Sequence, residues 1–316
     1  MRKNNHSLSV VIPVYNDEQV LSELIKRLVP VCIKLYNDDY EIIFIDDGSR
    51  DKSYDILVGL FQQYKEIKVL KQAKNFGQAN AILAGLKFAR GKYVVIMDSD
   101  LQDKPEDIPI LIKEMETSAS AMAIALWESR RDTPIKRLTS WMFYTFSQNV
   151  TNIKYEKGLG VFRVIERDKI INLLDVPEIT GTILSLIYWS GISYVAVPLK
   201  RDKRHAGASG YSLKKMLSLT ADRIFSYSLF PMKIMTNSGL LIGLGSFGVG
   251  IFTLVRKLIG ASVLPGWTSI IIIVSFLFGL NFIFLGLLGE YIGRIYLETK
   301  KRPKYVTEIV LDRDER

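Results

Sequence analysis

Two long runs of uncharged, mostly apolar residues constrain this chain more than any other feature of its sequence. The runs Met235–Val255 and Ser269–Gly289 contain no Asp, Glu, Lys or Arg. Each has roughly the 20 residues that a helix needs to cross the hydrocarbon core of a membrane. Two buried helices of a soluble domain are the alternative, but uncharged runs of this length are rare there. Because the connection 256–268 is short, the sequence predicts a hairpin of two transmembrane helices.

The charges around this hairpin predict its orientation, because basic residues mark the cytoplasmic side of a membrane protein. They are more numerous beyond the two ends of the hairpin than in its loop. The outer residues are Lys233, Arg294, Lys300, Lys301, Arg302 and Lys304, against Arg256 and Lys257 in the loop. We therefore expect a multi-pass protein integral to the inner (cytoplasmic) membrane, with its N-terminal domain and C-terminal tail in the cytoplasm.

Composition agrees with this placement. The net charge of +9 together with 48% hydrophobic residues indicates a membrane surface or phosphorylated ligands, and no nucleic acid partner. The single cysteine, Cys32, excludes an intrachain disulfide and fits a reducing compartment. Residues 1–7 are polar and lack the apolar core of a signal peptide.

Amphipathic segments precede the hairpin. Residues 213–234 mix aliphatic and aromatic side chains with lysine and arginine, a pattern typical of a helix lying in the membrane interface. Residues 135–150 form a second such segment, for which a helix packed in the core is an equal alternative. The predicted parts are a cytoplasmic catalytic domain, interface helices, two transmembrane helices and a cytoplasmic tail, at residues 1–210, 211–234, 235–297 and 298–316.

Strands alternate with helices in the N-terminal domain. Short apolar runs rich in β-branched residues predict strands, and patterns with a period of 3.6 predict helices. Strands are expected at 8–14, 40–45, 67–70, 94–97 and 121–125, and helices at 17–28, 53–64 and 79–89. This alternation predicts an α/β fold with a doubly wound, mostly parallel sheet.

The strand expected at 94–97 ends in a cluster of oxygen ligands. Asp98 and Asp100 follow it directly, and Gln102 and Asp103 come next. A buried strand that ends in acid is costly unless a cation lies there. Mg²⁺ or Mn²⁺ prefers oxygen ligands and is often held by one or two carboxylates together with substrate phosphates. A polar turn is the alternative for so short a motif.

Two other strand ends carry polar residues, at Pro13–Asp17 and Asp46–Asp51. Ligands of open α/β sheets bind beyond the carboxyl ends of the strands, so three polar ends indicate a nucleotide site. Asp46 or Asp47 could accept a hydrogen bond from a base or a ribose. A turn with a helix N-cap is the alternative for this segment.

The segments Val11–Asn16, Asp46–Asp51, Asn75–Gly77 and Asp98–Asp103, in this order and spacing, resemble the motifs of family 2 glycosyltransferases with the GT-A fold. More narrowly, they are similar to the polyprenyl-phosphate glycosyltransferases, the group that holds dolichol-phosphate mannose synthase and the bacterial GtrB-type glucosyltransferases. The resemblance runs from residue 9 to about residue 305.

The resemblance implies roles for individual positions. Around the donor nucleoside it places Pro13, Tyr15, Glu18, Asp46 and Asp47. For the metal and the donor diphosphate it implies Asp98, Asp100 and Gln102. In the basic segment that begins at Arg201, the residues implied to hold the diphosphate are Arg204, Ser209 and Tyr211. A solvated basic loop near a membrane is the alternative for this segment.

The middle of the chain departs from the family pattern. Many relatives carry an acid just before a Phe-Arg pair, where this chain has Val161. The expected nucleophile is a phosphate monoester, whose second pKa of about 6 makes it largely a dianion at neutral pH. We therefore expect Arg163 to hold the acceptor phosphate by two parallel hydrogen bonds and to act with Asp98 and Asp100 in catalysis. An ordinary ion pair at the surface or at a strand end is the alternative for Arg163. Glu156 is the alternative, as a substitute base.

The resemblance implies an inverting glycosyltransferase that moves a sugar from a nucleotide diphosphosugar to a polyprenyl (undecaprenyl) phosphate, with Mg²⁺ or Mn²⁺. Glucose from UDP-glucose is the expected donor, and a UDP-aminosugar or GDP-mannose are alternatives. A polysaccharide synthase is a rival, but it usually needs more membrane spans. A catalytically silent membrane scaffold is another rival, which the missing acid supports. Assembly into a homo-oligomer is possible for proteins of this kind.

Overall fold

The computed structural model describes residues 6–127, 158–174, 183–201, 266–300 and 302–313, and isolated positions between 235 and 259. The chain divides into two compact units. The first unit comprises Met1–Gln148, Ile153–Tyr211 and Pro303–Arg316, and the second comprises Asn149–Asn152 and Ser212–Arg302. Most of the second unit is therefore inserted between two parts of the first.

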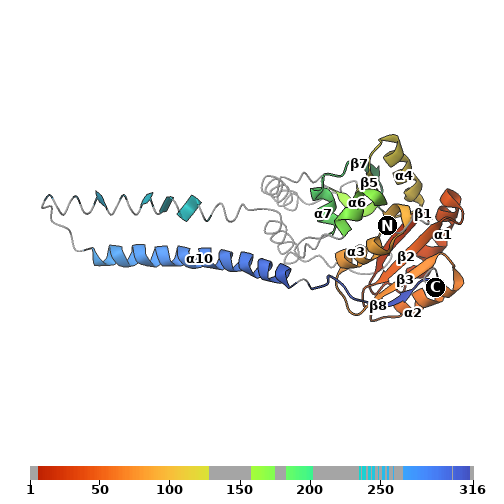
Figure 1. Cartoon of the computed structure of the whole chain (residues 1–316), viewed down its shortest axis with the longest axis horizontal. Helices are drawn as coiled ribbons and strands as arrows, with labels where there is room; N and C mark the ends of the chain where they lie inside the picture. Colours follow the sequence, from red (N-terminus) through yellow and green to blue (C-terminus); the bar gives the residue numbers. More distant parts are fainter. Residues whose placement is uncertain are drawn as a thin grey trace. The chain divides into compact units, whose positions relative to one another are not determined.

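Within the described residues, the first unit is built on an eight-stranded sheet of order β7-β5-β6-β4-β1-β2-β3-β8 (Figure 1). The strands are β1 His6–Val14, β2 Tyr40–Asp46, β3 Ile67–Gln72, β4 Gly91–Ile96, β5 Met122–Trp127, β6 Leu159–Glu166, β7 Tyr194–Leu199 and β8 Thr307–Leu311. The pairs β4–β6, β5–β6 and β3–β8 are antiparallel, and the others are parallel. The predicted parallel arrangement is confirmed for the centre of the sheet, but the whole sheet is mixed.

Helices cover both faces of this sheet. They are α1 Leu21–Tyr36, α2 Ser53–Gln63, α3 Gln78–Phe88, the 3-10 turn η1 Pro105–Asp107, α4 Ile108–Thr117, α6 Arg167–Leu174 and α7 Ile183–Trp189. Neighbouring residues of a strand point to opposite faces. Val10 and Ile12 accordingly share one buried core with α1, α2 and α4, whereas Val11 shares the other with α3, α6 and α7. The α/β prediction is thus confirmed.

Helix α1 begins at Leu21, four residues after the predicted start at Asp17. The reason is that Asp17 belongs to the turn at the edge of the sheet. Its backbone N–H donates to Ser53 Oγ at 2.9 Å, and its carboxylate accepts a hydrogen bond from Ser99 Oγ. These contacts with the start of α2 and with the turn after β4 hold Asp17 outside the helix.

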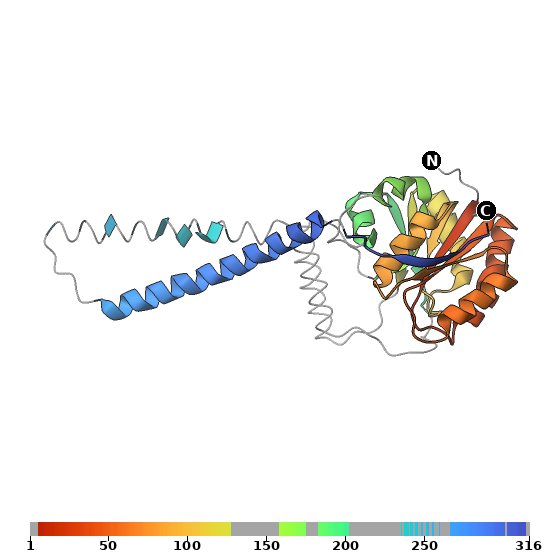
Figure 2. The same cartoon turned by 60° about the horizontal axis from the view of Figure 1, so that its bottom comes forward.

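The segment predicted to be a C-terminal tail contributes a strand to the sheet. Strand β8 pairs antiparallel with β3, with Val69 opposite Leu311 and Gln72 opposite Thr307. It lies at the sheet edge beside β3, as Figure 2 shows. Residues 303–316 therefore belong to the first unit.

The second unit contains the 33-residue helix α10, Trp267–Thr299. Its window Phe276–Gly293 is long and apolar enough to cross a membrane, and none of that window is buried. No other such helix is present in the part of the chain that the structure describes. The run 235–255 is described at isolated positions, and residues 135–150 and 213–234 lie outside the described residues. The two-helix hairpin and the interface helices therefore stay predictions.

Strand β4 lies very close to β1 at Gly91, and a substitution of this glycine tests the contact. A Cβ at Gly91 would lie 2.5 Å from the backbone nitrogen of Ser9 and 2.7 Å from the carbonyl carbon of Leu8. Because both atoms belong to a central strand, we expect Gly91→Ala to lower the free energy of unfolding by about 2 kcal/mol or more.

The measurement is the thermal unfolding midpoint in detergent, with Gly59→Ala as the matched control. Gly59 lies in α2 with open space around its Cβ position. Alanine at an exposed helical position is favoured over glycine by about 0.5–1 kcal/mol, so the control should be unchanged or more stable. A Gly91→Ala protein as stable as the control would show that the two strands are not this close.

Candidate active site

Three polar strand ends meet at one edge of the sheet. Strand β1 lies between β2 and β4 and is parallel to both, so the turns after these strands are neighbours. The turns are joined by hydrogen bonds: the Asn16 N–H donates to Ser49 Oγ at 3.1 Å, and Ser99 Oγ donates to the carboxylate of Asp17. The structure therefore brings together the segments that sequence reasoning singled out, 13–17, 46–51 and 98–103.

The turn after β4 is folded around a buried carboxylate. The side chain of Asp103 is 1% exposed and accepts a hydrogen bond from the Asp98 N–H at 3.2 Å. Leu101 has a φ of 60°, a conformation that is costly for leucine, and burial of its side chain holds it there. The carboxylate of Asp100 accepts from the Gln102 N–H at 3.1 Å. These contacts fix the backbone that carries the three acids.

Two carboxyl groups of this turn resist ionisation. Burial, and then the negative charge of Asp100, raise the pKa of Asp98 to about 6. Burial, and then the charge of Asp98, raise the pKa of Asp103 to about 7. Acids crowded together in this way favour the approach of a cation, and perturbed acids of this kind are typical of functional sites.

Arg201 is the cation that the structure places among these acids. Its Nη2 lies 3.6 Å from Asp98 Oδ2, and its Nε lies 3.5 Å from Asp103 Oδ1. The guanidinium also lies over the ring of Trp127, 5.3 Å from its centroid. Sequence reasoning chose Arg204 from the same basic segment and missed Arg201. The signal that could have identified Arg201 is its position just after an apolar run, which is strand β7.

Asp46 and Asp47, at the end of β2, are both buried. The two oxygens of Asp47 accept hydrogen bonds from the Phe76 and Gly77 N–H groups, each at 2.8 Å. Asp46 accepts from the Ser49 N–H at 3.2 Å. Burial is the main cause that raises the pKa of each carboxyl. Asp47 thus holds the loop before α3, and direct contact of either acid with a nucleoside stays a prediction.

The other residues expected around the nucleoside lie at the same edge in different environments. Pro13 is buried near the end of β1, and Tyr15 is 43% exposed in the turn that follows. The carboxylate of Glu18 accepts from the Lys52 N–H at 2.9 Å and so braces the turn after β2. Tyr15 is therefore the one of the three whose side chain is open to a ligand in this structure.

Arg163 lies in β6 and is 2% exposed. Its Nε donates to the Val161 carbonyl at 2.9 Å, its Nη2 donates to the Gly160 carbonyl at 2.7 Å, and the guanidinium lies 5.3 Å from the Tyr188 ring centroid. Burial lowers the pKa of this arginine. In this structure Nε and Nη2 donate to these carbonyls, and the expected contact of Arg163 with a phosphate stays a prediction. Among the described residues, Nη1 alone of its nitrogens has no hydrogen-bond partner.

Several expected site residues lie outside the described residues. They are Arg204, Ser209 and Tyr211 of the basic loop, and the alternative base Glu156. Their roles stay predictions.

The acids after β4 fit a metal site that a substrate completes. Among the described residues, no three His, Cys, Asp or Glu side chains gather closely enough to hold an ion by themselves. Asp98, Asp100 and Gln102 nevertheless supply hard oxygen donors at the open edge of the sheet. Mg²⁺ and Mn²⁺ are usually bound in nucleotide enzymes by one or two carboxylates, with phosphate and water as the remaining ligands. The residues present match that pattern.

Comparison with solved structures agrees with the fold. Glucosyl-3-phosphoglycerate synthase from Mycobacterium tuberculosis, in complex with Mn²⁺, UDP-glucose and phosphoglyceric acid, has a TM-score of 0.52 with this chain at 17% identity. The match covers 70% of this chain and 78% of that one. At this level of identity the similarity concerns the fold alone, which is GT-A like.

Sequence comparison identifies the family. Residues 9–174 match Glycosyl transferase family 2. An uncharacterized glycosyltransferase of Bacillus subtilis (strain 168), YkcC, is 35% identical over 95% of this chain and 93% of its own length. A prophage bactoprenol glucosyl transferase homolog of Escherichia coli (strain K12) is 33% identical over 96% and 99%, and the bactoprenol glucosyl transferase of Shigella phage SfV is 33% identical over 95% and 97%. The predicted family is confirmed: this chain is a glycosyltransferase of family 2, similar along nearly its whole length to GtrB-type bactoprenol glucosyl transferases.

Proposed function

We propose that this glycosyltransferase moves a sugar from a nucleotide diphosphosugar to a polyprenyl phosphate, with inversion, at the cytoplasmic face of the inner membrane. The observation that carries the proposal is the meeting of three polar strand ends at one edge of the sheet, where half-buried Asp98 and buried Asp103 share Arg201. A divalent cation would complement the charge of the acids, and the diphosphate of a donor would complement the charge of Arg201.

Glucose from UDP-glucose is the proposed donor, and undecaprenyl phosphate is the proposed acceptor. Support comes from the relatives named bactoprenol glucosyl transferases and from the related fold that was crystallised with Mn²⁺ and UDP-glucose. A UDP-aminosugar or GDP-mannose remain the alternative donors, because selectivity depends on contacts to sugar hydroxyls.

The proposed chemistry needs charge stabilisation more than proton transfer. An oxygen of the acceptor phosphate attacks the anomeric carbon, and the bond from that carbon to the donor diphosphate breaks, so the diphosphate leaves with the electron pair. Mg²⁺ or Mn²⁺, held by Asp98, Asp100 and Gln102, would neutralise the leaving diphosphate. The attacking phosphate is already a dianion at neutral pH, so Val161 in place of an acid is compatible with turnover.

Arg163 and Arg201 are two of the positive charges near the acids at this edge. Nη1 of Arg163 is buried and has no hydrogen-bond partner among the described residues, so its proposed contact with the acceptor phosphate needs a movement that exposes it. Arg201 lies against Asp98, which places a second cation next to the proposed diphosphate position. Both charges favour the approach of two anionic substrates.

A membrane anchor is proposed for the second unit. Large apolar side chains of α10 are exposed along its length, among them Ile273, Phe276, Phe282 and Ile292. An apolar surface of this extent is unfavourable in water and is stable in contact with lipid chains. We therefore assign α10 as a transmembrane helix and residues 235–255 as its partner in a hairpin, with the interface helices at 211–234 beside the lipid headgroups.

The test is transfer from radiolabelled UDP-glucose, UDP-aminosugars and GDP-mannose to undecaprenyl phosphate by the full-length protein in vesicles. The proposal predicts a lipid-linked sugar from UDP-glucose that forms with Mg²⁺ or Mn²⁺ and is lost with EDTA. A catalytically silent scaffold, the alternative that Val161 supports, predicts no product from any donor. That result with folded protein would contradict the proposed function.

Substitution of Asp100 tests the metal assignment. Asp100→Asn removes a charge at a partly exposed strand end, so turnover should fall at least about 100-fold while the fold is kept. Asp98→Asn should also lose most activity. Asp55→Asn, an exposed acid on α2, is the control and should leave turnover unchanged. Near-wild-type turnover by a folded Asp100→Asn protein would refute the metal site.

The pH dependence tests whether a side chain must act as base. At saturating metal and donor, the rate should rise with pH through about 6, as the acceptor becomes a dianion, and then flatten. Glu156→Gln should leave this profile nearly unchanged. A loss of two or more orders of magnitude in kcat, at unchanged nucleotide binding, would instead identify Glu156 as a general base.

Arg163 is tested by Arg163→Lys, which keeps the positive charge but cannot make the same three contacts. We expect the apparent KM for lipid phosphate to rise about tenfold, with a smaller change in KM for the donor. The kinetic constants for both substrates are measured in vesicles. An equal rise in both values would mean that Arg163 only supports the strand.

A further inference from the structure

We propose that the C-terminal strap, residues 303–313, positions the active-site loop 73–77. The catalytic consequence of this proposal rests on the proposed function, but the structural coupling does not. The strap consists of β8 with the residues on either side of it, and the chain enters it shortly after α10 ends at Thr299. Three sets of contacts carry the inference.

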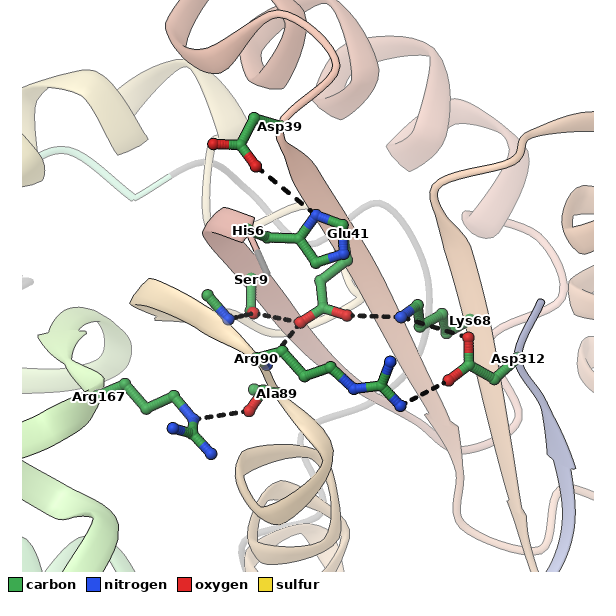
Figure 3. Close-up of polar contacts among 10 residues, drawn as sticks. His6, Ser9, Asp39, Glu41, Lys68, Ala89, Arg90, Arg167 and Asp312 are labelled. Atoms are coloured by element: carbon green, nitrogen blue, oxygen red, sulfur yellow. Dashed lines mark hydrogen bonds and ion pairs between the residues drawn. The ribbon is translucent and has the colours of Figure 1, made fainter. Parts of the chain in front are cut away.

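The first set is a buried cluster of charges that the strap completes (Figure 3). The side chain of Asp312 is fully buried; its Oδ1 lies 3.3 Å from Lys68 Nζ, and its Oδ2 lies 3.1 Å from Arg90 Nη2. Lys68 Nζ also lies 3.0 Å from Oε2 of buried Glu41. Loss of the Asp312 carboxylate would remove a buried negative charge from beside two buried cations, a strongly unfavourable change. The two cations therefore stabilise the docked strap through the carboxylate at position 312.

The cluster is tied to the centre of the sheet. Glu41 Oε1 accepts hydrogen bonds from Ser9 Oγ at 2.6 Å and from the Arg90 N–H at 2.7 Å, and the Gly91 N–H donates to Ser9 Oγ at 2.7 Å. These bonds join β1, β2 and the start of β4 around the same charges, as Figure 3 shows. The strap is thus anchored on a rigid part of the fold.

The second set of contacts holds the end of the strap. Arg313 donates to the Tyr64 carbonyl at 2.9 Å and to the Phe61 carbonyl, and its guanidinium lies over the Phe61 ring. These carbonyls lie at the C-terminal end of α2, where a cation is stabilised by the helix dipole. Leu311 packs on one core of the sheet and Tyr305 on the other.

The third set of contacts connects the strap to the active-site loop. Beyond the pair Gln72–Thr307, the Ala73 N–H donates to the Val306 carbonyl at 2.9 Å. The strap therefore fixes the residue at which loop 73–77 begins. At its other end, the loop gives the Phe76 and Gly77 N–H groups to Asp47.

The loop also leads directly to the proposed metal ligands. Gln78, the next residue, donates its side-chain N–H to Asp98 Oδ1. On the other side, a Cβ at Gly48 would lie 2.6 Å from the Lys74 carbonyl carbon, so the loop packs directly on the turn after β2. The loop is therefore held at one end by Asp47 and at the other by the strap, and its position sets that of Gln78 against Asp98. Truncation before residue 235 would remove this support together with the membrane segment.

The experiment is hydrogen exchange of the full-length protein in detergent, without ligand, with Asp312→Asn as the variant. The amides of residues 73–77 should exchange at least about tenfold faster, while the amides of β1 and of β4 beyond Gly91 keep their protection. The Kd for UDP with Mn²⁺ should rise by a similar factor. Asp38→Asn, which removes an exposed acid paired with Lys65 at 3.4 Å, is the matched control and should change neither value.

Arg313→Ala keeps the inference testable if Asp312→Asn does not fold, because Arg313 is exposed and lies at the end of the strap. It should speed exchange at 73–77 severalfold. Faster exchange of β8 with no change at residues 73–77 would overturn the coupling. If exchange responds as expected but the wild-type protein transfers no sugar, the strap is supported and the proposed function fails.

Discussion

The arrangement at the edge of the sheet depends on carboxylates held where water is scarce. Asp98 and Asp103 repel each other, and each loses solvation, so neither is stable as an anion without a cation nearby. Arg201 supplies that charge in the structure, and Trp127 supports its guanidinium from the side. A site balanced in this way is poised to exchange one cation for another, which is what the binding of a metal and a diphosphate requires.

The order of the two units along the chain gives the active-site edge of the sheet a second support. The second unit is inserted before the last strand of the sheet, so the catalytic fold is complete only after the chain has passed through α10. The buried ion pairs of Asp312 favour the docking of this strand at the sheet edge. Its pairing with β3 continues to Ala73, the first residue of the loop that leads to the partners of Asp47 and Asp98. The part assigned to the membrane and the part assigned to donor binding are thus joined by covalent chain at both ends of the inserted segment.

The sequence predicted the centre of the fold because strands β1 to β4 are strongly patterned and each ends in polar residues. It missed β8, whose five residues acquire their alternating burial only by docking on β3. It missed Arg201 because β7 lies in the sheet three positions from β4, so the two ends meet only in the folded protein. It did not predict that Arg163 donates to the carbonyls of Gly160 and Val161, because these bonds lie within its own strand and no sequence pattern marks them.

The most direct test of the account is the position of Mn²⁺, located by anomalous diffraction from crystals of the full-length protein grown with UDP. The account predicts one anomalous peak at coordination distance from Asp98 or Asp100 and from the diphosphate, with the guanidinium of Arg201 no longer bridging Asp98 and Asp103. Bound UDP without a peak near Asp98 or Asp100, and with Arg201 still between the two acids, would contradict it.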